Sequence, residues 1–488
     1  MTTKKNSKNF YICTAIAYVN DKAHVGHAMD FIYADVLARY ERQLGSNVLF
    51  SIGTDEHGSK ISEKAVEAGL TPQAFTDSIV PKWQEFAKLA GVSNDRFVRT
   101  TIPAHEKRAQ IIWKNLDTYI YKGSYIGWYC VGCEEYHSEA VAKENNGVCP
   151  LHNRPYEKIE EENYFFALSK FTAQVREAIE TGTLKIIPES KASEIINVLK
   201  AGLDDISISR SKGKVSWGIP VPGDDTHTMY VWFEALMNYI TILGYPEHPD
   251  FATFWPANVQ VIGKDILRFH AAIWPAMLIG LGLPLPEKLY VHGHVTANGQ
   301  KMSKTLGNVI DPVEVIHEWG VDAFRYYLLR HIPSHDDGDF SADRFEAVYN
   351  SELANELGNA VQRVGSMIMK YMDGVVGDVP ESEHDQGAYH EALAGCRFDK
   401  ALEEVWEQVR GLNQYIDISK PWAIAKDGDS AHLREVLAYC VSCINEIAEL
   451  LVPFLPETSA KITAIFKDGI IRMPETTLFP KKERLEEK

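Results

Sequence analysis

The chain has 488 residues, 45% of them hydrophobic and 24% charged, with a formal net charge of −17. This length predicts two to four domains, and the composition excludes a disordered or fibrous protein and indicates a globular one. No apolar run reaches the roughly 18 residues of a membrane span, and the polar, basic first residues lack the apolar core of a signal peptide. We therefore expect a cytoplasmic protein. The negative charge argues against a nucleic-acid partner unless specific residues provide the contacts.

The first part of the chain alternates between strand and helix patterns. Apolar residues recur at helical spacing from His24 to about Gln43. The residues on this face are Val25, Ala28, Ile32, Val36 and Tyr40. Apolar, β-branched segments on either side predict buried strands at 9–19 and 47–58. Strand, helix and strand at this spacing indicate a parallel, right-handed βαβ unit.

Further strands and helices are expected downstream. Two helices should follow at 59–70 and 71–91, with the second broken at Pro81 because proline cannot donate a helical hydrogen bond. Later apolar segments predict more strands of the α/β domain, at 228–236, 258–266 and 288–296. After Phe345 the pattern is helical nearly to the end and predicts a helix bundle.

The sequence pattern changes between residues 118 and 223, where turn residues, charged residues and potential metal ligands accumulate. We interpret this stretch as an insertion. The predicted fold class is therefore α/β, with a parallel-sheet Rossmann-type catalytic domain, an inserted zinc-binding domain and a C-terminal α-helix bundle. The expected segments are 1–117 and 224–296 for the two halves of the catalytic domain, 118–223 for the insertion, 297–345 for a lysine loop and stem-contact region, 346–470 for the bundle and 471–488 for a tail.

Two histidines, His24 and His27, stand three residues apart where the first strand leads into the first helix. Ligands of open α/β sheets bind beyond the carboxyl ends of strands, and free N–H groups at a helix N-terminus attract phosphate. Gly26 between the histidines would allow a ligand to approach the backbone. This arrangement predicts a phosphate site, although histidines in such a place can also be ordinary capping or surface residues.

A second candidate phosphate site is the segment "GQKMSKTLGN", which carries Lys301 and Lys304 between Gly299 and Gly307. A mobile lysine loop can close over a triphosphate and neutralise the charge of the leaving pyrophosphate. Taken alone, a lysine pair is more often a solvated surface.

Together, "HVGH" and "KMSKT" resemble the two signatures of the class I aminoacyl-tRNA synthetases, usually written HIGH and KMSKS. They stand in the expected order at the two ends of the α/β domain. Val25 and Thr305 are the departures, and threonine keeps the hydroxyl. The segments "AIAYVNDKAHVGHA", "GTDEHG", "YVWFEALMNY", "GKDILRFHAAIWPAML" and "HGHVTANGQKMSKTLGN" are similar to the methionyl-tRNA synthetase family over nearly the whole chain.

The resemblance implies an apolar, aromatic pocket for methionine, which suits a thioether that packs well against rings. The positions matching the family's pocket are Ile16, Tyr18, Trp232, Ala235, Tyr239, Ile266, His270 and Trp274. Trp232, Ala235 and Tyr239 have the spacing of one helical face. Leu236 stands where some members have proline. Without the resemblance, these aromatic residues would be read as core.

Two aspartates also acquire roles from the resemblance. Asp55 matches the residue that pairs with the methionine ammonium, although aspartate beside glycine is commonly a turn former. Asp265 matches a residue near the ribose of ATP. The implied reaction is attack of the methionine carboxylate on the α-phosphorus of ATP, with Mg²⁺ accompanying ATP, followed by transfer to the terminal ribose of tRNA(Met), initiator or elongator. It needs no general base, so the protein supplies positioning and charge stabilisation.

Four residues have the spacing of a zinc site. Cys130 and Cys133 form a close pair, and Cys149 and His152 form another after fifteen intervening residues. Four protein ligands complete tetrahedral Zn²⁺ and leave no open position for catalysis, so the predicted zinc is structural. The family carries a similar knuckle in its inserted domain. The remaining cysteines, Cys13, Cys396, Cys440 and Cys443, are expected to be buried core residues.

A tRNA reader can rely on base edges and stacking instead of bulk charge, which answers the objection from the net charge. The resemblance implies that Asn359, Arg363 and Trp422 bind the anticodon, with Asn355 beside them. By spacing alone they would be a solvated helix face and a core tryptophan.

Two rival functions remain open on the sequence. A cysteine-specific class I synthetase uses zinc to hold its substrate, but here four ligands lie away from the histidine motif. An RNA-binding protein with a dead catalytic domain is disfavoured by the intact motif residues. The chain ends soon after the predicted bundle and lacks a further C-terminal domain through which some family members dimerise, so we expect a monomer.

Overall fold

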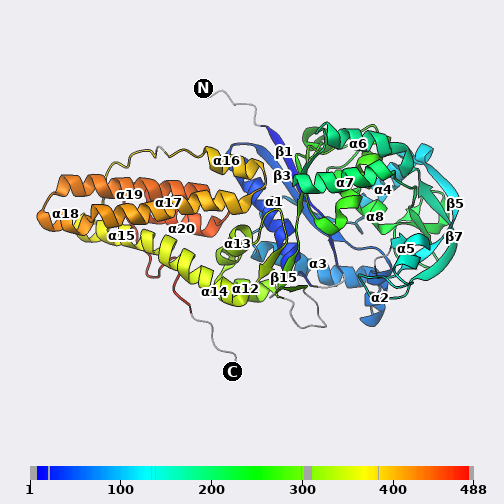
Figure 1. Cartoon of the computed structure of the whole chain (residues 1–488), viewed down its shortest axis with the longest axis horizontal. Helices are drawn as coiled ribbons and strands as arrows, with labels where there is room; N and C mark the ends of the chain where they lie inside the picture. Colours follow the sequence, from blue (N-terminus) through cyan, green and yellow to red (C-terminus); the bar gives the residue numbers. More distant parts are fainter. Residues whose placement is uncertain are drawn as a thin grey trace.

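The structure is a computed structural model that describes residues 8–19, 22–132, 135–137, 139–297, 299–301, 310–382 and 384–482. It has the mixed α/β architecture expected from the sequence. A parallel sheet lies at the centre of an elongated molecule, an antiparallel sheet extends from one side, and a bundle of helices extends from the other (Figure 1).

The central sheet has seven strands, and every neighbouring pair is parallel. Its strands are β1 (Asn9–Thr14), β2 (Ala17–Tyr18), β3 (Asn47–Asp55), β4 (Arg96–Arg99), β8 (Lys185–Ile187), β13 (Val259–Gly263) and β14 (Lys288–His292). The order is β2-β3-β1-β13-β14-β8, with β4 paired to β3. Because chain order reverses between the neighbours β1 and β13, the carboxyl ends of these strands form the switch point where ligands of such sheets bind.

The predicted first helix is confirmed as α1 (Val25–Gln43), and Val25, Ala28, Ile32 and Val36 on its inner face are buried. The next helices are α2 (Ser59–Glu67), α3 (Pro72–Leu89) and α4 (Pro103–Asn115). The predicted break at Pro81 is wrong, since α3 continues through it. Val80 and Trp83 on either side of the proline are buried, and this packing holds the helix together where one backbone hydrogen bond is missing.

The predicted strand at 228–236 is also wrong for most of its length. β12 (Asp224–Met229) ends early and pairs antiparallel with β10 (Ser209–Ser211) and β11 (Pro220–Val221), outside the central sheet. From Val231 the chain forms α8 (Val231–Ala235). A short apolar run without alternation is compatible with either a buried strand or a buried helix, and here the helix forms.

The predicted insertion contains an antiparallel sheet and also part of the central sheet. β5 (Ile120–Cys130), β6 (Glu135–His137), β7 (Glu157–Phe166) and β9 (Ile206–Ser207) form the antiparallel sheet, with α5 (Glu139–Glu144) beside it. However, β8 returns to the central sheet as its edge strand, flanked by α6 (Thr172–Glu180) and α7 (Glu189–Ala201). The range 118–223 is therefore not a structurally separate domain, since it contributes β8 to the central sheet. The other domain boundaries stay predictions.

The second half of the catalytic region consists of short elements. They are α9 (Asn238–Thr241), α10 (Pro249–Phe254), a 3₁₀ turn Lys264–Ile266, a π-helical turn η4 (Phe269–Ile273), α11 (Trp274–Gly280), β15 (Val295–Ala297), β16 (Gln300–Lys301), α12 (Pro312–Trp319), α13 (Val321–Arg330) and β17 (Gly338–Phe340). β15 lies between β16 and β17 in a small sheet of its own. This sheet carries the start of the lysine segment.

The predicted helix bundle is confirmed. It contains α14 (Ala342–Val348), the π-helical η6 (Tyr349–Gly358), α15 (Asn359–Tyr371), α16 (Gly387–Ala394), α17 (Phe398–Ser419), α18 (Pro421–Asp427), α19 (Ser430–Leu451) and α20 (Pro456–Ile465). Buried Arg325 of α13 joins the bundle to the catalytic domain, because it pairs with Asp35 of α1 at 2.8 Å and donates to the carbonyls of Pro453 and Phe454.

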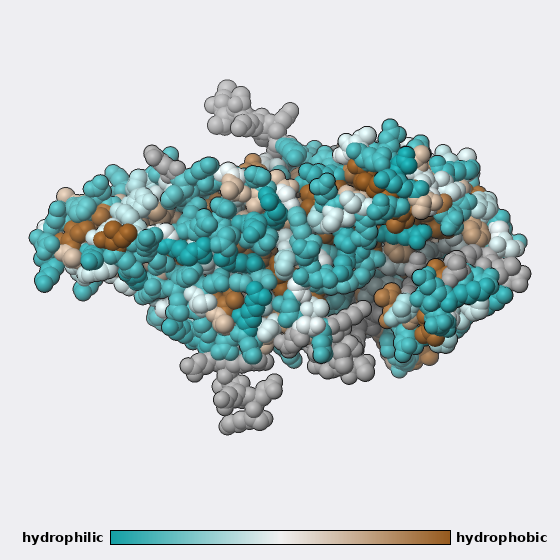
Figure 2. All heavy atoms as spheres, viewed as in Figure 1, coloured by the Kyte–Doolittle hydropathy of each residue, from teal (hydrophilic) through white to brown (hydrophobic). Residues whose placement is uncertain are grey.

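Hydrophilic residues cover most of the face shown in Figure 2, and the hydrophobic ones form small separate areas. Among the helices of the described residues, none combines the length and apolarity needed to cross a membrane. The expected burial of Cys13, Cys396, Cys440 and Cys443 is confirmed.

Candidate active site

The two histidines of the "HVGH" segment form the start of α1. His24 is the N-cap residue, and its Nδ1 accepts the N–H of Gly26 at 3.1 Å. Nδ1 of His27 in turn accepts the N–H of His24 at 3.2 Å, and the two ring centroids are 3.8 Å apart. Each Nδ1 accepts a hydrogen bond from a backbone N–H, so in each neutral ring the proton is on Nε2. The capping role and the predicted phosphate role therefore use different ring nitrogens.

Burial lowers the pKa of both imidazoles, and that of His27 falls well below its usual value because the neighbouring His24 adds to the effect. Both rings are thus neutral near pH 7 and carry Nε2–H groups at the N-terminus of α1, where the helix dipole favours anions. Gly26 also has a structural role beside the one expected. A Cβ at this position would lie 2.9 Å from the ring of His24, so glycine makes room for that ring.

The lysine segment is described only at its beginning. Lys301 pairs through its backbone with Thr296 in the β15–β16 hairpin, whose turn contains Gly299 at φ +74°. The side chain of Lys301 and all of Lys304 lie outside the described residues.

The predicted methionine pocket is assembled around a tyrosine–histidine pair. The Tyr239 hydroxyl is 2.6 Å from Nε2 of His270, and Nδ1 of His270 is 3.0 Å from the carbonyl oxygen of Ile266. Nδ1 must donate to that carbonyl, so Nε2 accepts from the hydroxyl. Burial lowers the pKa of His270 to about 4, which leaves the ring neutral. The ring of Trp274 lies 5.7 Å from that of Tyr239 and extends the same wall.

Trp232 and Ala235 lie on α8, whereas Tyr239 lies on α9, so the expected single helix is two short ones. Ala235 is buried and Trp232 half-buried. Trp232 stacks on Phe269 with ring centroids 4.2 Å apart. That contact brings α8 against the π-helical turn that holds His270. Single π turns are frequent at functional sites because they shift side chains out of α-helical register.

The remaining predicted pocket residues come from the other half of the sheet. Tyr18 of β2 pairs in register with Asp55 of β3, and the buried Asp55 accepts the N–H of Val19 through its carbonyl at 3.2 Å. Ile16 precedes this pair and lies over Gly53, where an added Cβ would be 3.1 Å from Ile16 Cγ2. Strand pairing thus places Ile16, Tyr18 and Asp55 together at the carboxyl end of β3.

Asp265 lies in the exposed turn after β13, and its Oδ2 is 2.5 Å from Nε2 of His294. The neighbouring strand β14 ends at His292, whose Nε2 is 2.8 Å from Oδ1 of Asp30 on α1. Since Asp30 follows His27 by three residues, this ion pair ties the Asp265 side of the sheet edge to the first turns of α1.

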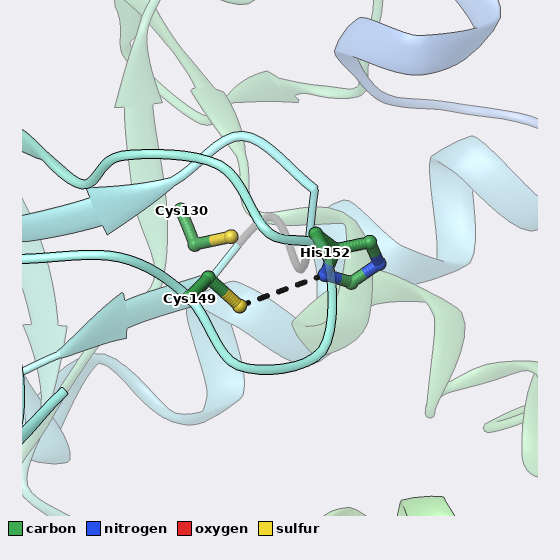
Figure 3. Close-up of side chains that lie close together, drawn as sticks. All are labelled: Cys130, Cys149 and His152. Atoms are coloured by element: carbon green, nitrogen blue, oxygen red, sulfur yellow. Dashed lines mark hydrogen bonds between the residues drawn. The ribbon is translucent and has the colours of Figure 1, made fainter.

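Three of the four predicted zinc ligands lie together. The ligand atoms of Cys130, Cys149 and His152 are all within 4.8 Å of one another, and Figure 3 shows the three side chains turned toward one point. Cys149 Sγ is 3.7 Å from Nδ1 of His152. Cys133 lies outside the described residues. Thiolate and imidazole donors at this separation suit zinc, so the described residues fit the predicted metal.

The predicted anticodon residues lie on η6, α15 and α18 of the bundle. Asn355 and Asn359 are exposed on η6 and α15, two and one helical turns before Arg363, respectively. The Arg363 guanidinium lies 5.9 Å from the ring centroid of Trp422 on α18 and pairs with Asp417 at 2.5 Å. Trp422 is 42% exposed, so the prediction of a core tryptophan from spacing alone would have been wrong. Exposed hydrophobic residues gather at this end of the bundle in Figure 2.

A family model described as tRNA synthetases class I (M) matches residues 10–158 and 142–365. The chain is 40% identical to a methionine–tRNA ligase of Thermotoga maritima, over 93% of this chain and 74% of that protein. It is 41% identical to one of Streptomyces coelicolor, over 94% and 90%. The chain belongs to the methionine–tRNA ligase family of class I tRNA synthetases.

Solved structures agree with this family assignment. Mycobacterium tuberculosis methionyl-tRNA synthetase in complex with methionyl-adenylate superposes with a TM-score of 0.90 at 34% identity, covering 97% of this chain and 100% of that one. The free form of the same enzyme gives 0.85 at 32% identity, covering 99% and 100%.

Two side chains of this family member contact residues of the candidate pocket but were missed from the sequence. Phe269 stacks on Trp232, and the hydroxyl of Tyr11 donates to the Tyr239 carbonyl at 3.0 Å. Phe269 directly precedes His270, so its position within "LRFHAAIW" was a usable signal. Tyr11 lies within an apolar strand, where a core residue and a supporting residue have the same pattern.

Proposed function

We propose that this chain activates L-methionine with ATP to form methionyl-adenylate and transfers the methionyl group to tRNA(Met), initiator and elongator alike. The observation that carries the proposal is the buried Tyr239–His270 pair, with Trp274 against the Tyr239 ring, at the carboxyl edge of the same sheet as Asp55 and the histidine pair. Trp232 stacks on Phe269, the residue before His270. A neutral imidazole, a hydroxyl and aromatic rings suit a thioether, which offers only a weak hydrogen-bond acceptor.

In this proposal the substrate is held at three points. Asp55 pairs with the ammonium of methionine, the aromatic wall holds the thioether, and the Nε2–H groups of His24 and His27 hold phosphate oxygens of ATP. Asp265 lies near the ribose. The methionine carboxylate is already a nucleophile, so the residues position the reactants and stabilise charge without a general base.

In the proposed mechanism, Lys301 and Lys304 neutralise the charge of the leaving pyrophosphate. Mg²⁺ bound to the triphosphate supplies further charge neutralisation. The carboxylate–phosphorus bond forms as the bond from the α-phosphorus to the pyrophosphate oxygen breaks.

Zinc is proposed as a structural ion on Cys130, Cys133, Cys149 and His152. The buried apolar cluster around these residues is small: Cys130, Ala142, Cys149 and Tyr156, with Trp128 packed against it. A core of this size cannot by itself order such a loop, so a tetrahedral metal would supply the missing cross-link.

Binding of tRNA is proposed at the far end of the bundle. Asn355, Asn359 and Arg363 offer hydrogen bonds to base edges, and exposed Trp422 offers a stacking face for an unpaired base. Recognition through these groups is compatible with the net charge of −17. A monomeric state and a cytoplasmic location complete the proposal.

Amino-acid-dependent exchange of labelled pyrophosphate into ATP tests the function directly. With purified protein, exchange that depends on methionine supports the proposal. Exchange that depends on cysteine instead, or no exchange with any amino acid, would overturn it. Charging of a tRNA(Met) transcript in the same preparation tests the second step, and sedimentation tests the monomer.

A further inference from the structure

A fully buried carboxylate, Glu234, lies between two residues of the proposed methionine wall. It follows Trp232 and precedes Ala235 on α8, and its side chain is 0% exposed. Its Oε1 is 2.8 Å from Nδ1 of His57, and its Oε2 is 2.9 Å from Nε2 of His105. Both oxygens therefore have a donor, as a carboxylate removed from water requires. The chemistry proposed above makes no use of this group.

The two histidines come from different elements. His57 stands two residues after Asp55 in the turn that ends β3. His105 lies on α4, and its Nδ1 is 2.8 Å from the hydroxyl of Thr241 at the end of α9. Glu234 thus connects the turn that carries the ammonium partner with the two helices that carry the aromatic wall.

Electrostatic interactions strengthen the hydrogen bonds of Glu234 with His57 and His105. Burial alone would raise the pKa of Glu234, but His57 and His105 outweigh burial and hold it below its usual value. The carboxylate is therefore ionised, and charge-assisted hydrogen bonds of this kind are shorter and stronger than neutral ones. Trp217 packs edge-on against His57 with ring centroids 5.3 Å apart and donates its indole N–H to the Glu56 carbonyl, which fixes the ring from its other side.

We propose that Glu234, held by His57 and His105, is a positioning residue that fixes the separation between Asp55 and the wall on α8 and α9. That separation sets the length of side chain that the site accepts. The inference rests on the proposed function, because Asp55 and the wall must hold the two ends of the same amino acid. One additional methylene in an apolar pocket changes kcat/KM by roughly 10- to 200-fold, so a fixed separation is sufficient to reject a longer side chain.

The test compares methionine with ethionine, whose thioether side chain is one methylene longer, in pyrophosphate exchange. In the wild-type protein methionine should be preferred by at least about 10-fold in kcat/KM. Glu234→Leu should raise the KM for methionine by about 10-fold or more, leave the KM for ATP within about 2-fold, and bring the preference close to unity. Glu234→Gln keeps an acceptor and a donor in place and should retain the preference within about 3-fold.

The matched control is Glu446→Leu in α19. Glu446 is also a buried glutamate, 5% exposed, and its carboxylate is 2.5 Å from Nδ1 of His384, but it lies in the helix bundle. This variant should leave both the methionine KM and the preference unchanged. His57→Leu removes one arm of the connection only and provides a second route if Glu234→Leu does not fold. It should shift the preference in the same direction.

A folded Glu234→Leu or His57→Leu protein with an unaltered preference would overturn the inference. So would a general loss of kcat with unaltered selectivity, which is the result expected of a merely structural role. Wild-type protein that shows no methionine-dependent exchange would overturn the proposed function instead, so the two failures are distinguishable.

Discussion

Replacement of His27 separates the capping role that the structure shows for one ring nitrogen from the phosphate role that we propose for the other. Nδ1 accepts the N–H of His24 at the start of α1, whereas Nε2 carries the proton available for a phosphate oxygen. Asparagine places an amide oxygen near the position of Nδ1, and glutamine places an amide nitrogen near that of Nε2. The variants His27→Asn and His27→Gln therefore each keep one role and lose the other.

The sizes of the two effects differ. His27→Asn keeps the cap and loses the phosphate donor, which should lower kcat for pyrophosphate exchange by about 10²- to 10³-fold, or about 3 to 4 kcal/mol of transition-state stabilisation. His27→Gln keeps the donor and loses the cap acceptor, which should reduce the free energy of unfolding by about 1 kcal/mol and activity by less than about 10-fold.

Exchange kinetics and chemical unfolding of both variants provide the assay. His317→Asn, at an exposed position near the end of α12, is the control and should change neither quantity. An His27→Asn protein as active as the wild type would refute the assignment of Nε2 to phosphate. Equal loss of activity in both variants would refute the separation of roles.

Further predictions concern the metal, the anticodon residues and the pocket. Cys149→Ser should abolish bound zinc measured by atomic absorption. The control Cys443→Ser, at another buried thiol, should retain one zinc ion per chain. Zinc retained by both variants would exclude the proposed site. Trp422→Ala should raise the KM for tRNA at least about 10-fold without changing pyrophosphate exchange, while Ile418→Ala, at an exposed apolar residue of the same bundle, should change neither. Because burial lowers the pKa of His270 to about 4, the unfolded state binds more protons below about pH 6.5, and stability falls as the pH drops through this window. Between pH 7 and pH 5, wild-type protein should therefore lose about 2 kcal/mol more unfolding free energy than His270→Gln in urea titrations, and equal losses would contradict this.

Local patterns predicted the parts of the fold that depend on local forces. The apolar face of α1 and the long helices of the bundle follow from the spacing of apolar residues within a few positions of one another. The paired spacing of Cys130 with Cys133 and of Cys149 with His152 was a similar local signal, and the three described residues of that cluster do lie together.

The errors occurred where tertiary packing decides between local alternatives. The apolar pattern of the run that starts at Tyr230 is compatible with a strand or a helix. The helix forms because Trp232 packs on Phe269 and Glu234 pairs with two distant histidines. The continuity of α3 through Pro81 depends on buried neighbours in the same way. Likewise, the return of β8 to the central sheet depends on its pairing with β14, about a hundred residues away along the chain.

The sequence supplied a set of candidate site residues but not the contacts between them. The family resemblance supplied Tyr239 and His270, but their hydrogen bond depends on a π-helical turn that no sequence period indicates. The partners of Glu234 come from 177 and 129 residues away, and its carboxylate was indistinguishable in the sequence from a surface glutamate.

A crystal structure with a non-hydrolysable methionyl-adenylate analogue is the most direct measurement of the central claim, that groups distant in the chain converge on one nucleotide and one amino acid. The account predicts the ammonium at Asp55, the thioether beside Tyr239 and His270, and the phosphate within hydrogen-bonding distance of Nε2 of His24 or His27. An analogue bound with its phosphate away from both imidazoles, or with its thioether outside the aromatic wall, would contradict it.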